Sequence, residues 1–119
     1  MSRIGNPVFD STRMMLKRTS KSSGARIWLD ASKYLSKSVS RKPKVNVGKI
    51  SRLTKKDDVV LIPGKVLGGG TVSHRIIVGA YSFTKSAAEK ITAAGGDALT
   101  IPKFLERYSS GKDVMLIGG

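Results

Sequence analysis

The chain has 119 residues, no cysteine and a formal net charge of +14 at pH 7. Its length fits one domain with one modest core, and the lack of cysteine excludes disulfides, thiolate zinc sites and iron–sulfur clusters. No export signal is visible and no apolar run approaches the roughly 18 residues that span a bilayer, so we expect a cytoplasmic protein without a membrane partner.

The first predicted helix begins at Asp10 or Ser11, which are good N-caps, and ends near Ser20, with Gly24 beyond its end. A basic stripe follows one side of this helix and consists of Arg13, Lys17, Lys21 and the neighbouring Arg18. Such a stripe is commonly a solvated face. Here it has no acidic partner four residues away, so its members repel one another unless an anion is near.

A second helix is predicted over residues 25–37. Ile27, Trp28, Ala31 and Leu35 recur at helical spacing and should face the core, whereas Arg26 lies on the opposite face. Trp28 has the chemistry to stack on a base, but a tryptophan on an apolar stripe is more often a core residue.

A basic loop, "SVSRKPK" at residues 38–44, separates this helix from a third one. Pro43 disfavours a helix through the loop, so Arg41, Lys42 and Lys44 should be free to reach a phosphate. The loop lacks apolar residues to bury, and we expect it not to be ordered in the isolated chain.

The third predicted helix follows in "NVGKISRLTKK", with Asn46 as a plausible N-cap. Val47, Ile50 and either Leu53 or Thr54 should face inward. The outer side of this helix carries Lys49, Arg52 and Lys56. It is the third basic surface within the first half of the chain.

At Asp57 the pattern changes to short apolar strands separated by helices. We expect a strand in "VVLI" that Pro63-Gly64 stops, a short strand in "KVLGGG", and further strands in "RIIVGAYSF", "DALT" and "DVMLIGG". One helix should be capped by Ser86 and Glu89 and closed by Gly95-Gly96, and another should carry Pro102 in its first turn. This alternation is typical of the α/β class.

The positive charge lies almost wholly in the first half of the chain. Residues 1–56 contain 15 basic and 2 acidic side chains, whereas residues 57–119 contain 7 basic and 6 acidic ones. We therefore predict a basic helical N-terminal region at 1–56 within the same domain as an α/β core at 57–119. Such asymmetry indicates a polyanionic partner, above all a nucleic acid.

The stretch "VVLIPGKVLGGG" has the look of a phosphate-binding loop, but its spacing is wrong. In a Walker-type loop, Val59 would have to be glycine and Val66 would have to be serine or threonine. A G-x-G-x-x-G fingerprint fails as well, because Ser73 follows Gly70 at the third position. The glycines fit a tight turn, and beside Lys65 they would also let a strand edge approach a sugar–phosphate chain.

Catalysis finds no support in the sequence, and we expect neither an enzyme nor a bound metal or cofactor. His74 is the one histidine and no cysteine exists to act as a nucleophile. Ser73-His74 would need a carboxylate and an oxyanion site that the sequence does not offer. His74 and Arg75 are better read as phosphate contacts at the start of a strand.

Three stretches carry a family resemblance: "VNVGKISRL", "DDVVLIPGKVLGGG" and "SFTKSAAEKITAAGG". Together they resemble the archaeal and eukaryotic ribosomal large-subunit protein eighteen family, which is related in fold to ribosomal protein fifteen. Length and the short basic N-terminus resemble the archaeal form. Asn46, Gly48 and Lys49 match the family's helix entry, and Gly64, Lys65 and Gly68 match its glycine loop.

The resemblance implies N-terminal helices followed by a small irregular β-β-α superhelical domain with a mixed sheet. It also implies a structural, non-enzymatic constituent of the large subunit that binds ribosomal RNA, contacts neighbouring ribosomal proteins and is a monomer within the ribosome, without a small-molecule substrate. A chromatin-like DNA-binding protein is the alternative. Charge and exposure select the expected RNA ligands: Arg13, Lys17, Arg18, Lys21, Arg26, Arg41, Lys42, Lys44, Lys49, Arg52, Lys65, His74 and Arg75.

Overall fold

A computed structural model of the chain describes residues 14–21, 24, 26–35 and 43–117. The expected RNA ligands Arg13, Arg41 and Lys42 lie outside these described residues, as does most of the loop at 38–44. Within that loop the expectation of disorder is wrong for its last two residues. Pro43 is buried and Lys44 begins a strand of the central sheet.

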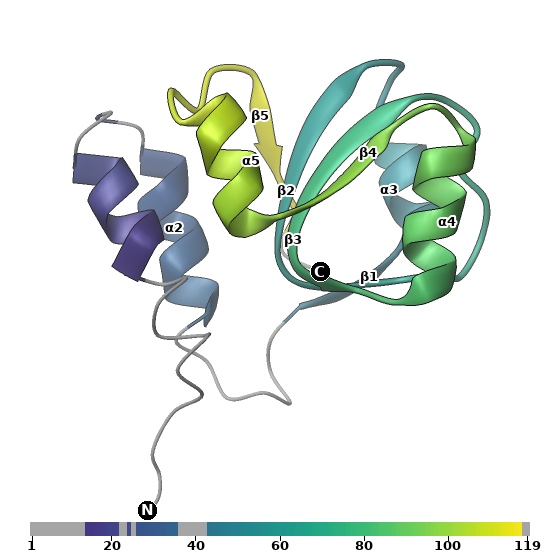
Figure 1. Ribbon diagram of the computed structural model, residues 1–119, viewed down its shortest axis with the longest axis horizontal. Coiled ribbons are helices and arrows are strands. Elements are labelled where there is room, and N and C mark those ends of the chain that lie inside the picture. Colours follow the sequence, from purple (N-terminus) through teal and green to yellow (C-terminus); the bar gives the residue numbers. More distant parts are fainter. Residues whose placement is uncertain (1–13, 22–23, 25, 36–42, 118–119) are drawn as a thin grey trace, which may run out of the picture.

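A parallel sheet forms the centre of the molecule (Figure 1). Its strands are β1 (Lys44–Asn46), β2 (Asp58–Leu67), β3 (Ile76–Phe83), β4 (Asp97–Thr100) and β5 (Val114–Leu116). The order is β1-β2-β3-β4, and β5 pairs with the first part of β2 on the edge whose last part pairs with β1. The α/β class is confirmed, but every pairing among the described strands is parallel, so the sheet is not mixed as we expected.

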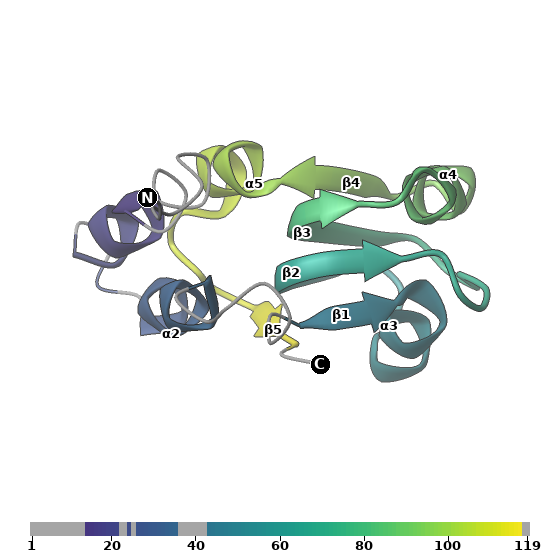
Figure 2. The same cartoon turned by 90° about the horizontal axis from the view of Figure 1, so that it is seen from below.

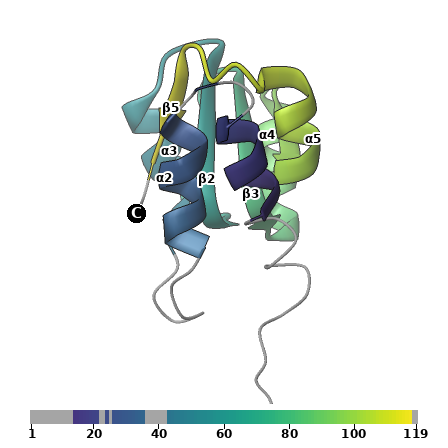
Figure 3. The same ribbon diagram turned by 90° about the vertical axis from the view of Figure 1, so that its left-hand side faces the viewer.

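Helices cover both faces of the sheet, which gives three layers (Figures 2 and 3). The helical residues 14–21, α2 (Arg26–Leu35) and α5 (Ile101–Tyr108) lie on one face. The other face is covered by α3 (Val47–Leu53) and α4 (Lys85–Ala93). The predicted helices are thus all present in the described part of the chain.

Alternation along the strands divides the core into two clusters. Leu61 and Ile77 point to the first face, where they pack with Leu16, Trp28 and Phe104. The intervening residues of β2 and β3 point to the second face and pack with residues of α3 and α4 in a cluster made of Val45, Val47, Ile50, Val60, Ile62, Val66, Ile76, Val78, Ala80, Ala87, Ile91 and Ile117. The first half of the chain therefore contributes to both sides of the core.

Trp28 is a core residue, as its apolar stripe predicts. It is fully buried, its Nε1 donates to the carbonyl of Ser109 at 2.7 Å, and its ring meets that of Phe104 edge-on with centroids 6.0 Å apart. These contacts join α2 to α5. They leave no exposed face for a base to stack on.

The strand that begins at "VVLI" does not stop at Pro63-Gly64. β2 continues to Leu67, and the register with β3 shifts between Ile62 and Lys65. This irregularity accommodates Pro63, which has no N–H to donate to a ladder. Gly64 lies against the backbone of Pro43, whose carbonyl accepts a hydrogen bond from the Lys65 amide at 2.9 Å.

The helix α4 begins earlier than the expected capping box. Thr84 is its N-cap, and the Thr84 hydroxyl accepts a hydrogen bond from the Ala87 amide at 3.2 Å. The predicted box of Ser86 and Glu89 is wrong, because Ser86 already lies inside the helix. Closure by glycine is confirmed: the amides of Gly95 and Gly96 donate back to carbonyls of the last turn, and Gly95 has a φ of 87°.

Residues 68–75 connect β2 to β3 and return along the length of β2. They do so because β3 begins beside the start of β2, with Ile76 opposite Asp58. The connection contains no helix. It passes the beginning of α3, where the Gly48 amide donates to the Gly69 carbonyl and a groove forms between the two segments.

Candidate nucleic-acid interface

The start of α3 and the glycines of the 68–75 connection touch through their backbones. The Gly48 amide donates to the Gly69 carbonyl at 2.9 Å. A Cβ on Gly48 would lie 3.1 Å from the Gly70 Cα, and a Cβ on Gly70 would lie 2.7 Å from the Gly48 Cα. Gly70 also has a φ of 90°, a backbone conformation that favours glycine. The glycines are therefore required for this close approach within the protein.

Two side chains from other elements hold the same glycines. The Oδ1 of Asn46 accepts a hydrogen bond from the Gly69 amide at 3.0 Å. The ammonium of Lys90, on α4, donates to the carbonyls of Gly68 and Gly70, both at 2.6 Å. Asn46 occupies the N-cap position of α3, as expected, but its side chain does not cap the helix. It binds the glycine loop instead.

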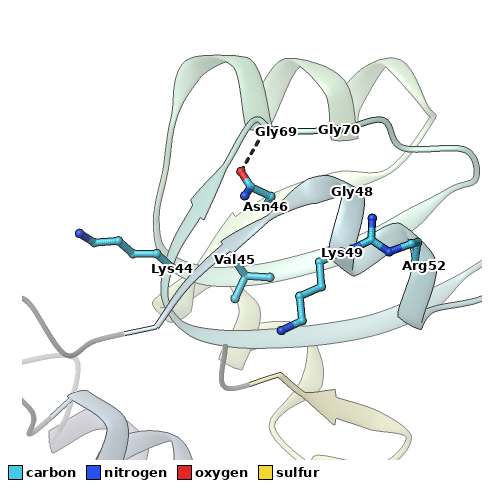
Figure 4. A pocket seen from close by; sticks show the side chains of 8 residues that line it. All are labelled: Lys44, Val45, Asn46, Gly48, Lys49, Arg52, Gly69 and Gly70. Atoms are coloured by element: carbon cyan, nitrogen blue, oxygen red, sulfur yellow. Dashed lines mark hydrogen bonds between the residues drawn. The ribbon is translucent and has the colours of Figure 1, made fainter.

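A groove of about 420 Å³ lies between these elements (Figure 4). It is lined by Lys44, Val45, Asn46, Gly48, Lys49, Arg52, Gly69 and Gly70. Lys44 extends from β1, whereas Lys49 and Arg52 extend from α3. The lining contains three cationic side chains and no carboxylate. The groove lies at the carboxyl ends of β1 and β2. Open α/β sheets commonly bind ligands at this edge.

A fourth cation stands beside the groove. Lys65 on β2 is the direct partner of Lys44 on β1 in the parallel register, and both side chains are exposed. Neighbouring strands lie about 4.8 Å apart, so two like charges at partnered positions repel each other. An anion between them would remove that repulsion.

A second basic surface lies at the other end of the molecule, on the helical residues 14–21 and α2 (Figure 1). Lys17, Arg18 and Lys21 are exposed there. Arg26 is also exposed, and its Nε lies 3.7 Å from the Asp30 carboxylate in an ion pair that is open to solvent. Exposed pairs of this kind contribute little to stability, so Arg26 can exchange its partner for another anion.

His74 already has partners on both ring nitrogens. Its Nε2 lies 2.9 Å from the Thr54 hydroxyl and its Nδ1 lies 3.1 Å from the Ser73 hydroxyl. Thr54 donates its hydroxyl hydrogen to the Ile50 carbonyl, so its oxygen accepts from His74 Nε2. Ser73 also contacts the Ser51 hydroxyl at 3.0 Å. The network joins the end of α3 to the 68–75 connection.

Arg75 is bound within the protein as well. Its Nη1 donates to the Asp57 carboxylate at 2.8 Å and its Nε donates to the Gly95 carbonyl at 3.1 Å. The hydrogen bond to Asp57 raises the pKa of the guanidinium above its ordinary value. A phosphate at His74 or Arg75 would have to displace these contacts, so the assignment of both residues to RNA stays a prediction.

The described residues offer little other chemistry. Within residues 14–21, 24, 26–35 and 43–117, no three His, Asp or Glu side chains gather where they would hold a metal ion. None of the helices in that part of the chain is both long and apolar enough to cross a bilayer. What the structure assembles from described side chains is a set of cations without acidic neighbours at the groove.

Sequence reasoning found the cations of the groove but missed what shapes it. Charge and exposure select Lys44, Lys49 and Arg52, and the structure brings these three together. The roles of Asn46 and Lys90 in holding the glycine loop were missed, because they depend on contacts with residues about 20 positions away in the chain. The only signal in the sequence was the cluster of three glycines, which indicated that another part of the chain or a ligand lies close to the backbone there.

The chain is similar in sequence to known ribosomal proteins. A family model described as ribosomal proteins, with 50S-L15, 50S-L18e and a 60S protein as its members, matches residues 39–99. The chain is 40% identical over 102 residues to the large ribosomal subunit protein eL18 of Methanothermobacter thermautotrophicus, covering 86% of this chain and 84% of the relative. It is 36% identical over 114 residues to the eL18 protein of Pyrobaculum aerophilum, covering 93% of each, and 40% identical over 112 residues to that of Methanococcus maripaludis, covering 94% and 93%.

Proposed function

Because this chain belongs to the ribosomal protein family that includes 50S-L15 and 50S-L18e, we propose that it is a structural constituent of the large ribosomal subunit and binds large-subunit ribosomal RNA through its basic side chains. Its role is architectural and it is not an enzyme. It acts in the cytoplasm, as a component of the ribosome. Its resemblance is to the archaeal members.

The observation that carries the RNA-binding part of this proposal is the groove beside the glycine loop. Lys44, Lys49 and Arg52 line it, Lys65 stands next to Lys44, and no carboxylate is among its lining residues. A groove that is lined by cations and lacks carboxylates has a positive potential that attracts an anion. Folded ribosomal RNA is such an anion, since each neutralised phosphate also releases condensed counterions.

The basic helices contribute a second contact in this proposal. Lys17, Arg18 and Lys21 are exposed on the opposite end of the molecule from α3 (Figure 1). A protein with cations at both ends bridges separate RNA segments, which suits the packing of a large folded RNA. A duplex-DNA reader would instead present one recognition element or a dimer interface. We therefore favour RNA over the chromatin-like alternative.

Neighbouring ribosomal proteins are further partners in this proposal, and the chain acts as a single copy per subunit. Exposed apolar side chains at Leu53 and Met115 are places where such a neighbour would bury surface. The proposal concerns the class of partner, a protein of the same subunit.

The test is the binding of the full chain to the large subunit. A variant with Lys44→Glu, Lys49→Glu and Arg52→Glu should no longer co-sediment with large subunits through a high-salt wash, because the groove would repel phosphates. The matched control reverses three exposed cations of the second half, Lys85→Glu, Lys103→Glu and Lys112→Glu. The control has the same net charge and should sediment with the subunit.

Two results would contradict the proposal. One is equal retention of both charge-reversed variants, which would mean that the groove does not contact RNA. The other is a wild-type chain that ignores structured ribosomal RNA at low ionic strength and binds duplex DNA as a free protein. That second result would favour the DNA-binding alternative.

A further inference from the structure

A lysine outside the groove holds one of its walls. Lys90 is not among the residues that line the groove, and it is half-buried on α4. Its ammonium nevertheless donates to the carbonyls of Gly68 and Gly70, each at 2.6 Å. Charge-assisted hydrogen bonds of this length are among the stronger ones in proteins. Lys90 thereby connects α4 to the loop that forms the wall.

The wall would have little shape of its own without such contacts. Three consecutive glycines have more conformational freedom than any other tripeptide, and Gly70 is held at a φ of 90°. Lys90 fixes the first and third glycines. The middle one, Gly69, is fixed by the Gly48 amide and the Asn46 side chain. The wall is thus ordered before any ligand arrives.

The same contacts make the wall suitable for an anion. The carbonyl oxygens of all three glycines carry partial negative charge, and each accepts a hydrogen bond from a donor within the protein. Two of these bonds come from a cation, which places a positive charge behind the wall. Among the described residues, none accepts a hydrogen bond from the Gly70 amide, so that donor is available to a ligand.

The lining also indicates which part of an RNA fits. Unpaired bases are commonly recognised by stacking on aromatic side chains, and no aromatic residue lines the groove. The glycines of the wall have no side chains with which to read a base edge. Lys44, Lys49 and Arg52 supply instead the groups that neutralise phosphates.

We propose that Lys90 is a positioning residue for this groove: it holds the glycine wall in a fixed shape that accepts the ribose–phosphate backbone of RNA rather than its bases. The inference rests on the proposed function, since it assumes that the groove binds ribosomal RNA. It adds a residue outside the contact surface and a ligand class within it. Lys90 acts through the glycines and does not touch the phosphate.

The experiment compares two lysines of α4 that carry the same charge. Lys90→Met removes the contacts to the wall, whereas Lys85→Met removes an exposed charge at the first position of the same helix. Binding of the full chain to large-subunit ribosomal RNA transcribed in vitro should weaken about tenfold more for Lys90→Met, because a mobile wall loses entropy on binding. Lys90→Arg, which keeps the charge and the donors, should restore most of the affinity.

Two further measurements separate positioning from contact. The slope of log affinity against log salt should stay unchanged in Lys90→Met, whereas Lys49→Met, in the groove, should lower its magnitude by about 0.7 to 0.9. Hydrogen exchange of the Gly69 amide, which donates to Asn46 Oδ1, should accelerate in the free Lys90→Met protein and stay unchanged in Lys85→Met and Lys49→Met. Oligouridylate and oligocytidylate of equal length should bind the wild type equally.

Each alternative outcome has a defined meaning. Equal losses in Lys90→Met and Lys85→Met would overturn the positioning role, while a loss in Lys49→Met would leave the proposed function intact. A preference for one homopolymer that Lys49→Met abolishes would overturn the backbone as the ligand. No RNA binding by the wild type would overturn the proposed function itself. If Lys90→Met fails to fold, Asn46→Ala decides: unchanged exchange of the Gly69 amide and unchanged affinity would overturn the preformed wall.

Discussion

Gly64 illustrates how a single missing side chain lets two strands meet. It is buried in β2, and a Cβ at this position would collide with the carbonyl of Pro43. That carbonyl has no freedom to move, because it accepts the hydrogen bond from the Lys65 amide. The lysines of the two strands can be partners only because the backbone of β2 comes this close to the chain that enters β1.

Replacing Gly64→Ala should therefore lower the free energy of unfolding by about 2–4 kcal/mol, since the backbone of one strand must shift. Gly24→Ala serves as the comparison. Gly24 has a φ of 74° but open space around its Cα, so only backbone strain of about 1 kcal/mol is expected. Urea unfolding of both variants measures the difference, and a smaller loss for Gly64→Ala would contradict the proposed clash.

Tyr81 gives the protein a dependence on alkaline pH. Its phenol is half-buried in β3, and desolvation raises its pKa above the ordinary value of 10.0. Below about pH 10 both folded and unfolded chains keep the proton, and the stabilisation is fully present. As the pH rises further, the unfolded chain loses the proton first, so stability falls.

The free energy of unfolding should thus decrease above about pH 10 more steeply in the wild type than in Tyr81→Phe. Urea unfolding at several pH values measures the two slopes. A difference in the free energy of unfolding that is the same at every pH would report only the loss of the hydroxyl group. Parallel curves over this range would show that Tyr81 does not titrate differently in the folded state.

At the scale of elements, α5 is the helix that joins the N-terminal helices to the sheet. Phe104 is fully buried, packs over Gly79 of β3 and meets both Trp28 and Tyr108. A Cβ on Gly79 would occupy the space of the Phe104 ring. The aromatic side chain and the glycine are therefore one packing unit.

Phe104→Leu should cost about 1–2 kcal/mol through lost area and lost ring contacts. Because Trp28 is the single tryptophan of the chain, its fluorescence reports on this junction directly. The emission of the folded state should change in Phe104→Leu and stay unchanged in Phe83→Leu, a substitution that belongs to the other core cluster. Equal effects on emission would mean that the two clusters are not separate.

Most elements could be predicted from local sequence, and the errors arose where distant residues decide. The apolar stripe of α2 and Pro102 in α5 predicted helices correctly, because both signals act within a few residues. Thr84 and Ser86 are both able to cap α4, and only the path of the chain from β3 selects Thr84. The continuation of β2 past Pro63 depends on Pro43, about 20 positions earlier, which no local pattern reveals.

The candidate site shows the same contrast between features set by local sequence and features set by distant residues. Charge alone predicted the cations, because solvation keeps Lys and Arg side chains at the surface in almost any fold. Their grouping into one groove depends on the pairing of β1 with β2 and could not be read from the sequence. His74 and Arg75 were predicted as phosphate contacts for their charge, and local sequence did not reveal their partners Thr54 and Asp57, which lie about 20 positions away.

For the whole molecule, the notable result is that the basic first half does not form a single surface. Among the described residues, Lys17, Arg18 and Lys21 belong to helical segments that cover one face of the sheet. Lys49 and Arg52 belong to α3, which covers the other face (Figure 2). β1 and α3 are part of the core, so they cannot be regarded as an appendage of the second half. The boundary at residue 56 stays a prediction.

Two separate surfaces should contribute separately to RNA affinity. Lys17→Gln with Lys21→Gln, and Lys44→Gln with Lys49→Gln, should each reduce the magnitude of the salt slope by up to about 1.4 to 1.8, and the fourfold variant by the sum. Titrations of ribosomal RNA at several salt concentrations measure this. A pair of substitutions without effect would exclude its surface from the RNA contact.

The connection between β2 and β3 is just long enough to join the two parallel strands. β2 has 10 residues and spans about 30 Å, and the eight residues at 68–75 must cover nearly that distance to bring Ile76 beside Asp58. Eight residues reach that far only when most of them are extended. Deleting Val72 and Ser73 should prevent β3 from pairing with β2 in the register that sets Ile76 opposite Asp58, and should abolish cooperative unfolding. Inserting two glycines after Thr71 should be tolerated. The length of the connection thus fixes where β3 begins, while the conformation of the glycines within it depends on the hydrogen bonds from Gly48, Asn46 and Lys90.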